Sequence, residues 1–388
     1  MPFWKSASPT LTTIRNSHKA KVATRQHKGG AQTRVSTQST NDTTMKAHFS
    51  NRLLHFKQPA GTSRGVYTTH LSYYVTIEKD GICGTGECSV LPDLSCDAMP
   101  KERYEAMLEK VCSFVEKTEG IPYELLRPYP SILFGLETAF AQLDAHGSTA
   151  LFDTPFAHGK EGITINGLVW MGTFEEMYAR LEEKLKAGFH CVKLKIGAIE
   201  FDKELELIKF IRKHFNSKQV ELRVDANGGF SPQNAMQRLE ALAKYDIHSI
   251  EQPIKQHQWK EMAQICRESP LPIALDEELI GINQPEQKNR LLDEISPAYI
   301  VLKPSLHGGM AGCREWISFA KERGIGSWLT SALESNVGLN AVAHFCASVY
   351  GPNVKMPQGL GTGLLYEDNI TMPLEIIGDK LWYKAPNC

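Results

Sequence analysis

The sequence from His190 to Ala226 reads HCVKLKIGAIEFDKELELIKFIRKHFNSKQVELRVDA. It begins and ends with short, nearly continuous apolar runs, His190–Ile196 and Glu221–Ala226, which are typical of buried β-strands. Between them, Asp202–Phe215 carries apolar residues at the spacing of an amphipathic helix. A strand, a helix and a second strand in this order predict a pair of parallel strands joined by a helix.

The same alternation continues on both sides of this stretch. Further apolar runs are Ile163–Val169, Ser249–Pro253, Pro272–Leu275, Tyr299–Leu302 and Ser327–Thr330. Helical patterns lie between runs at Phe174–Ala187, Pro232–Tyr245 and Met310–Arg323, after cap or turn signals such as Thr173 and Ser231. The fold class is therefore α/β, and seven such units favour a TIM-type (β/α)7β barrel. An open, doubly wound sheet is the alternative.

The pattern divides the chain into four parts. Residues 45–148 have strand-like alternation followed by helical patterns at Lys101–Lys117 and Ser131–His146, which indicates an α+β capping domain. Residues 149–365 form the expected barrel. Residues 366–388 are too few for another domain, and we expect this tail, with its apolar residues from Leu374 to Tyr383, to pack back on the capping domain.

Residues 1–44 differ in composition from the rest. They are basic and rich in Ser, Thr and Gln, and their single acidic residue is Asp42, so they cannot bury enough apolar surface to fold alone. Three interpretations stay open: an organelle transit peptide, an artificial extension, or a misread start with Met45 as the true first residue. We favour the last two.

Composition excludes several classes of function. The formal net charge is −1, from 43 Lys+Arg against 44 Asp+Glu, so nothing favours a nucleic-acid or membrane partner. No apolar stretch reaches the roughly 20 residues of a membrane helix. The nine cysteines contain no C-x-x-C pair, which favours a reducing compartment. We expect a cytoplasmic enzyme acting on a small molecule, and the sequence leaves homo-oligomerisation open.

Ionisable residues follow five successive runs, where a parallel barrel carries its active site. Lys193 and Lys195 share the inward face of their strand, because the apolar residues that alternate with them must face the helices. Each of the next three runs has a carboxylate close to its carboxyl end. These carboxylates are Asp225, Glu251 and Asp276. A lone residue of this kind is usually a helix cap or a solvated charge, but five of them in register indicate a site.

Three adjacent carboxylates repel one another unless a cation holds them. Their hard oxygen ligands suit Mg²⁺, with Mn²⁺ as the other candidate ion. Glu277 and Glu278 adjoin Asp276 and stay open as alternative ligands. Lys303 ends the sixth run, across an eight-stranded barrel from the second, so Lys195 and Lys303 should flank the metal from opposite sides.

These residues carry a family resemblance. Lys-Leu-Lys (193–195), Val-Asp-Ala-Asn (224–227), Ile-Glu-Gln-Pro (250–253), Leu-Asp-Glu (275–277) and Leu-Lys-Pro (302–304) resemble the muconate-lactonizing-enzyme subgroup of the enolase superfamily. The resemblance extends from Met45 onward. Within the subgroup, IVLKPSLHGG at 300–309 is most similar to o-succinylbenzoate synthases.

The resemblance implies a Mg²⁺-dependent syn dehydration in menaquinone biosynthesis. Its substrate would be 2-succinyl-6-hydroxy-2,4-cyclohexadiene-1-carboxylate and its product o-succinylbenzoate. Lys195 would remove the proton next to the ring carboxylate, and Lys303 would stabilise the intermediate from the other face. Asn227 and Lys193 are expected among the substrate-binding residues, and they would also support the metal and the base. Arg64, in the segment Gly61–Gly65, and Ser331 are expected to contact the substrate, although a plain hairpin turn explains Arg64 equally well.

Three other functions fit the same residues. An N-acyl amino acid racemase or dipeptide epimerase would use Lys195 and Lys303 on opposite faces of one carbon. A Schiff-base aldolase would use one of these lysines as a nucleophile. A barrel without activity would serve as a binding module. The five ionisable residues together favour an enzyme, and Pro304 after Lys303 favours dehydration.

Overall fold

The computed structural model describes residues 44–62, 65–197 and 200–385. Residues 1–43 and Arg64 therefore lie outside the described residues, and the interpretations given for them stay predictions. Among the described residues, no helix combines the length and the apolar character needed to cross a bilayer.

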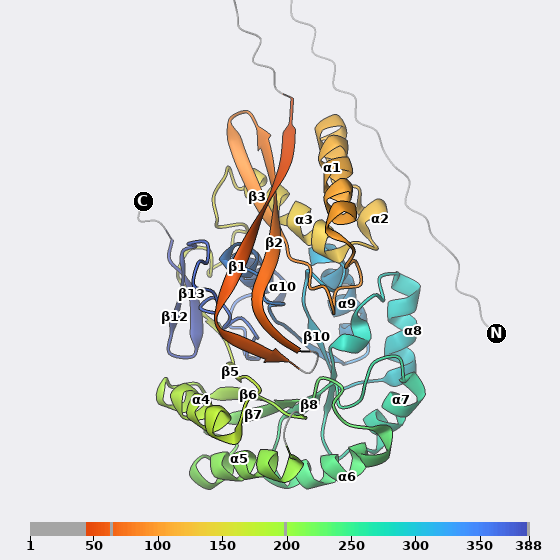
Figure 1. Cartoon of the computed structure of the whole chain (residues 1–388), viewed down its shortest axis with the longest axis vertical. Coiled ribbons are helices and arrows are strands. Elements are labelled where there is room, and N and C mark those ends of the chain that lie inside the picture. The colour runs from red at the N-terminus through yellow and green to blue at the C-terminus, as the bar shows by residue number, and fades with distance from the viewer. Residues whose placement is uncertain (1–43, 63–64, 198–199, 386–388) are drawn as a thin grey trace, which may run out of the picture. The chain divides into compact units, whose positions relative to one another are not determined.

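An antiparallel sheet and three helices make up the N-terminal module (Figure 1). The strands are β1 (Lys46–Thr62), β2 (Gly65–Lys79) and β3 (Ile82–Cys88), and the helices are α1 (Lys101–Thr118), α2 (Tyr123–Leu126) and α3 (Pro130–Asp144). Alternate residues of β2, such as Val75 and Ile77, pack against Leu108 and Val111 of α1. This core is separate from that of the larger sheet.

Seven parallel strands form the larger sheet in the order β11-β10-β9-β8-β7-β6-β5. The strands are β5 (Gly167–Val169), β6 (Cys191–Lys195), β7 (Glu221–Asp225), β8 (Ser249–Glu251), β9 (Ile273–Leu275), β10 (Tyr299–Leu302) and β11 (Gly326–Leu329). The predicted alternation of parallel strands and helices is confirmed. Because each strand lies beside its neighbours in the chain, the doubly wound alternative, which needs a reversal of strand order, is wrong.

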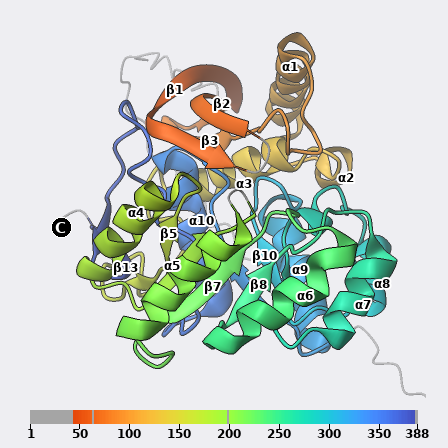
Figure 2. The same cartoon turned by 60° about the horizontal axis from the view of Figure 1, so that its bottom comes forward.

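Helices connect successive strands of this sheet, and Figure 2 shows several of them along its outer face. Their bounds are α4 (Phe174–Lys186), α5 (Phe201–His214), α6 (Pro232–Leu242), α7 (Trp259–Glu268), α8 (Pro285–Ile295), α9 (Gly309–Glu322) and α10 (Asn336–Tyr350), with short 3₁₀ turns at Ala243–Tyr245 and Glu277–Leu279. Capping boxes begin α4 at Thr173 and α6 at Ser231, as the sequence signals predict.

The two edges of the seven-stranded sheet are bonded to one further segment. Asn166, just before β5, donates its N–H to the carbonyl of Gln358 at 3.0 Å, and Gly359 donates its N–H to the carbonyl of Leu329 in β11 at 2.8 Å. Both edges therefore use the backbone of residues 358–359 as a partner.

The C-terminal tail differs in part from expectation. Tyr366 pairs with Phe56 of β1, so the start of the tail does contact the N-terminal module. The hairpin of β12 (Leu374–Ile377) and β13 (Lys380–Tyr383) instead pairs with β4 (Ile163–Thr164). The run Ile163–Val169, predicted as one strand, is split between β4 and β5, and its first half is the edge that the tail completes.

Two buried carboxylates of the N-terminal module hold the starts of barrel helices. Glu137 of α3 accepts hydrogen bonds from the backbone N–H groups of Met310 and Ala311, in the first turn of α9, where Gly308 offers no capping side chain. Glu87 of β3 accepts bonds from Ser335 and Gly338 at the start of α10. Such groups satisfy N–H donors that the helix itself leaves unpaired.

Replacing Glu137 by alanine should lower the free energy of unfolding by about 1–3 kcal/mol, since two buried N–H groups lose their acceptor. Urea titrations would measure the loss. The variant Glu137→Gln, which keeps one acceptor oxygen, should lose less, and Glu109→Ala on the exposed face of α1 should lose little. An equal loss in Glu137→Ala and Glu109→Ala would contradict the capping role.

His344 of α10 should make stability depend on pH. It is fully buried between Phe156 and Tyr383, both ring nitrogens have no hydrogen-bond partner in the described residues, and burial lowers its pKa from 6.5 to about 3. Below pH 6.5 the unfolded chain binds a proton that the folded chain refuses, so stability falls as pH falls.

The variant His344→Leu removes this titration. We compare the free energy of unfolding of the variant with that of wild type at each pH. The difference, variant minus wild type, should be about 2 kcal/mol larger at pH 5 than at pH 7, because only wild type loses stability through this histidine. Chemical denaturation at both pH values measures the difference. Parallel wild-type and variant curves would show that His344 is not held neutral by the fold.

Candidate active site

The carboxyl ends of five neighbouring strands bring the ionisable residues together. In the register of the sheet, Lys195 of β6 lies opposite Asp225 of β7, and Asp225 lies opposite Glu251 of β8. Asp276 and Lys303 directly follow β9 and β10. Lys193 and Lys195 point to the inside of the sheet, and Val192 and Leu194 lie in the core with the helices, as alternation predicts.

Each carboxylate of this group is paired with a lysine. The Nζ of Lys193 lies 2.6 Å from Oε2 of Glu251 and 2.9 Å from Oδ2 of Asp225. The Nζ of Lys195 lies 3.0 Å from the same Asp225 oxygen, and Lys303 forms an ion pair with Asp276. Three lysine side chains thus face three carboxylates inside the protein.

Burial and charge act on these groups in opposite directions. Burial raises the pKa of Glu251, the negative charge of Asp225 raises it further, and Lys193 only partly offsets both, so the pKa lies well above its usual range. For Asp225, Lys193 and Lys195 outweigh the effect of burial and lower the pKa. Burial lowers the pKa of Lys303, but Asp276, Glu277 and Glu251 outweigh it and leave the pKa raised. The lysines therefore outweigh burial at Asp225 but not at Glu251.

The donor set fits a hard divalent cation. Asp225, Glu251 and Asp276 are at most 3% exposed, and Oδ1 of Asp276 has no hydrogen-bond partner among the described residues. In that part of the chain no three His, Cys, Asp or Glu side chains converge as a ready metal site. Lys193 holds Asp225 and Glu251, and Lys303 holds Asp276. Carboxylate oxygens are the ligands that such a cation prefers.

Glu277 and Glu278, left open as ligands, have other partners. Oε1 of Glu277 accepts a bond from Nδ2 of Asn227 at 2.9 Å. Oε1 of Glu278 accepts the N–H of His257 at 2.8 Å, and its other oxygen accepts a bond from Gln252. Asp276 is therefore the carboxylate of this triplet that pairs with Lys303.

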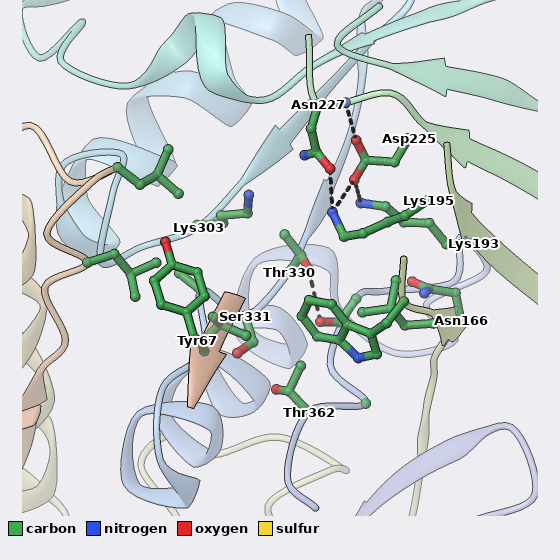
Figure 3. A pocket seen from close by; sticks show the side chains of 18 residues that line it. Tyr67, Asn166, Lys193, Lys195, Asp225, Asn227, Lys303, Thr330, Ser331 and Thr362 are labelled. Carbon is green, nitrogen blue, oxygen red and sulfur yellow. Dashed lines mark hydrogen bonds and ion pairs between the residues drawn. The ribbon is translucent and has the colours of Figure 1, made fainter. Parts of the chain in front are cut away.

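A cavity opens over these groups (Figure 3). Lys195 and Lys303 enter it from different sides, and Lys193, Asp225 and Asn227 also line it. The N-terminal module contributes Tyr67, Leu91 and Leu94, and residues of β5 and of the segments after β11 complete the lining. Asp225 is the one of the three carboxylates that lines the cavity, and Glu251 and Asp276 are paired with the cavity-lining Lys193 and Lys303.

Two other residues expected to bind substrate, Asn227 and Ser331, line the cavity but are also hydrogen-bonded to neighbouring side chains. Asn227 lines the cavity, but its Oδ1 accepts a bond from Nζ of Lys195 at 2.6 Å, so it contacts the expected base directly. Its backbone is left-handed, with φ of 42°, a conformation that Asn tolerates. Ser331 lines the cavity too, yet its hydroxyl donates to Glu334 at 2.6 Å.

Sequence reasoning missed several lining residues, among them Tyr67, Asn166, Trp170 and Thr330. Trp170 directly follows β5, so the strand-end argument that found the carboxylates could also have found it, whereas Asn166 precedes that strand. Tyr67 lies early in β2, and no local pattern marks it as facing a barrel.

A family comparison matches this geometry. The model described as "Enolase C-terminal domain-like" matches residues 176–378. The chain belongs to the enolase superfamily. This superfamily member is 45% identical over 359 residues to an o-succinylbenzoate synthase of Desulfotalea psychrophila, an alignment that covers 84% of this chain and 96% of the relative.

Solved structures agree with the superfamily fold. The crystal structure of MenC from Desulfotalea psychrophila superposes with a TM-score of 0.76 at 40% identity and covers 87% of this chain and 99% of that chain. The substrate-liganded L-Ala-D/L-Glu epimerase from Bacillus subtilis has a TM-score of 0.75 at 22% identity, covers 88% of this chain and 96% of that one, and shows the fold alone. These likenesses place the chain in the muconate-lactonizing-enzyme subgroup.

If Asp276 ligates the metal, Mg²⁺ titrated into the protein should bind at least tenfold more weakly to Asp276→Asn than to wild type, because one anionic ligand is lost. Isothermal titration calorimetry measures the dissociation constant. Glu278→Gln is the matched control, since Glu278 is bonded to His257 and Gln252, and its affinity should stay at the wild-type value. Equal weakening in both variants would contradict the assignment.

Proposed function

We propose that this enolase-superfamily protein is an o-succinylbenzoate synthase. The observation that carries the proposal is the 45% identity to the Desulfotalea psychrophila synthase over nearly the whole of both chains. Its substrate would be 2-succinyl-6-hydroxy-2,4-cyclohexadiene-1-carboxylate, and the reaction a syn loss of water in menaquinone biosynthesis. We assign it to the carbon–oxygen lyases.

In the proposed reaction, Lys195 acts as the base. Its neutral amine takes the proton from the ring carbon that carries the carboxylate, the C–O bond to the neighbouring hydroxyl breaks, and a new C=C bond makes the ring aromatic. The proton on Lys195 then goes to the departing hydroxide and forms water on the same face. Asp225 at 3.0 Å and Asn227 at 2.6 Å fix Nζ in position during both transfers.

Negative charge develops on the substrate carboxylate as the proton leaves. When bound by Asp225, Glu251 and Asp276, Mg²⁺ would neutralise that charge. Lys303 faces the cavity, and its raised pKa keeps it positively charged, so it stabilises the same charge from the other side. Lys193 remains charged beside the ligands, where its ammonium group holds Asp225 and Glu251 in place.

We also infer that the seven-stranded sheet is the (β/α)7β barrel of this subgroup. The hydrogen bonds of residues 358–359 to both edge strands support closure. Closure explains how Asn166, before β5, and Thr330, after β11, line one cavity.

An epimerase is the second candidate. The Bacillus subtilis L-Ala-D/L-Glu epimerase is 31% identical, but over 176 residues that cover 45% of this chain and 47% of the relative. Lys195 and Lys303 enter the cavity from different sides, which also suits removal and return of a proton on opposite faces of one carbon.

The decisive assay follows aromatisation of the cyclohexadiene substrate by ultraviolet absorbance. Wild type with Mg²⁺ should turn over, EDTA should abolish turnover, and Lys195→Ala should lower kcat by at least about 10³-fold because the base is gone. Lys244→Ala, an exposed lysine outside the site, should keep wild-type rates. Absence of turnover in wild type with Mg²⁺ bound would reject the synthase, and deuterium exchange into L-Ala-L-Glu would then test the epimerase.

A further inference from the structure

Trp170 occupies a fixed position at the rim of the cavity. It directly follows β5 and lines the cavity while remaining half-buried. The guanidinium of Arg180 in α4 donates to the carbonyl oxygens of Trp170 at 3.1 Å and of Met171 at 3.0 Å. The backbone that carries the indole is therefore tied to the barrel wall.

The indole has neighbours on two sides. It packs against the apolar cluster shared by the N-terminal module and the barrel loops, which includes Leu91 and Leu333. The Nζ of Lys195 lies over the ring, 5.9 Å from its centroid. One face of Trp170 thus looks toward the proposed base, at a distance where an ammonium group is attracted to an aromatic face.

This distance is too short for a ring to lie between the indole and Nζ, but a flat ring displaced along the indole face fits beside Nζ. Such an offset ring would lie about 3.5–4 Å above the indole plane, and its edge would face Nζ at the roughly 3–3.5 Å that proton transfer needs. The reacting carbon must approach Lys195, and therefore also this face. In the proposed substrate, that carbon belongs to a six-membered ring, whereas a dipeptide offers no ring there.

We propose that Trp170 is a specificity-determining residue whose indole face forms the subsite for the six-membered ring of the substrate and product. The inference rests on the proposed function and extends it to the group that selects the ring. Stacking of aromatic faces favours the flat product and the nearly flat diene over acyclic carboxylates. The same face stabilises the Lys195 ammonium formed when the proton is taken.

Product binding tests this subsite without turnover. With Mg²⁺ present, o-succinylbenzoate is titrated into wild type and into the variants Trp170→Ala, Trp170→Leu and Trp170→Phe by calorimetry and by tryptophan fluorescence. We expect about a tenfold or larger rise in Kd for the alanine and leucine variants and at most about a threefold rise for phenylalanine. Fluorescence quenching by the product should largely disappear in Trp170→Phe.

Trp382 provides the matched control. It is a half-buried indole of β13, packs against Gly162, and does not line the cavity. Trp382→Phe should keep both the wild-type Kd and the quenching. Thermal unfolding of every variant establishes that it is folded under the assay conditions.

Two outcomes overturn the inference. If wild type binds o-succinylbenzoate and the leucine and phenylalanine variants bind it equally well, aromaticity at position 170 does not select the ring, and the synthase proposal survives. If wild type neither binds o-succinylbenzoate nor forms it, the synthase proposal and this inference fail together. Loss of affinity in Trp170→Leu with retention in Trp170→Phe supports the ring subsite.

Discussion

Charge balance inside the sheet is the constraint on which the site depends. Parallel strands in register place Lys195, Asp225 and Glu251 side by side, and such groups are costly to bury unless each has an opposite charge close by. Lys193 and Lys303 complete the balance through Glu251 and Asp276. The lysines and the expected metal ligands are therefore parts of one electrostatic unit.

The cavity has two parts, a floor and walls, which serve different purposes. Its floor is the carboxyl edge of the sheet, where the backbone hydrogen-bond register fixes each side chain. Its walls include Tyr67, Leu91 and Leu94 from the N-terminal module and Trp170 from the rim of the barrel. Proton transfer needs side chains whose positions are fixed, and the sheet register at the floor provides this. The residues of the walls determine which substrate shapes fit.

Much of the fold followed from the sequence because its signals are local. Apolar runs of strand length between amphipathic helices gave the parallel sheet, and alternation within Val192–Ile196 placed two lysines inside it. The strand partner of the tail hairpin was harder to predict. Nothing in the sequence near Leu374 indicates that β4 ends at Thr164 and that its free edge pairs with the hairpin. The hydrogen-bond partners of side chains could not be predicted from the sequence either. Ser331 is bonded to Glu334 and Asn227 to Lys195, and both contacts depend on backbone turns that follow the strands. The sequence brought the lysines and acids together, and their roles in catalysis stay predictions.

Glu87 and Glu137 have a consequence for how new activities arise on this scaffold. Each reaches from the N-terminal module to the first turn of a barrel helix, so an exchanged module that lacks these two carboxylates would leave amide groups of α9 and α10 without acceptors. Point changes at the module's tip, where Tyr67 and Leu91 touch the cavity, carry no such penalty. Point substitutions at these cavity-lining residues therefore leave the helix starts intact, whereas exchange of the whole module requires that both carboxylates be kept.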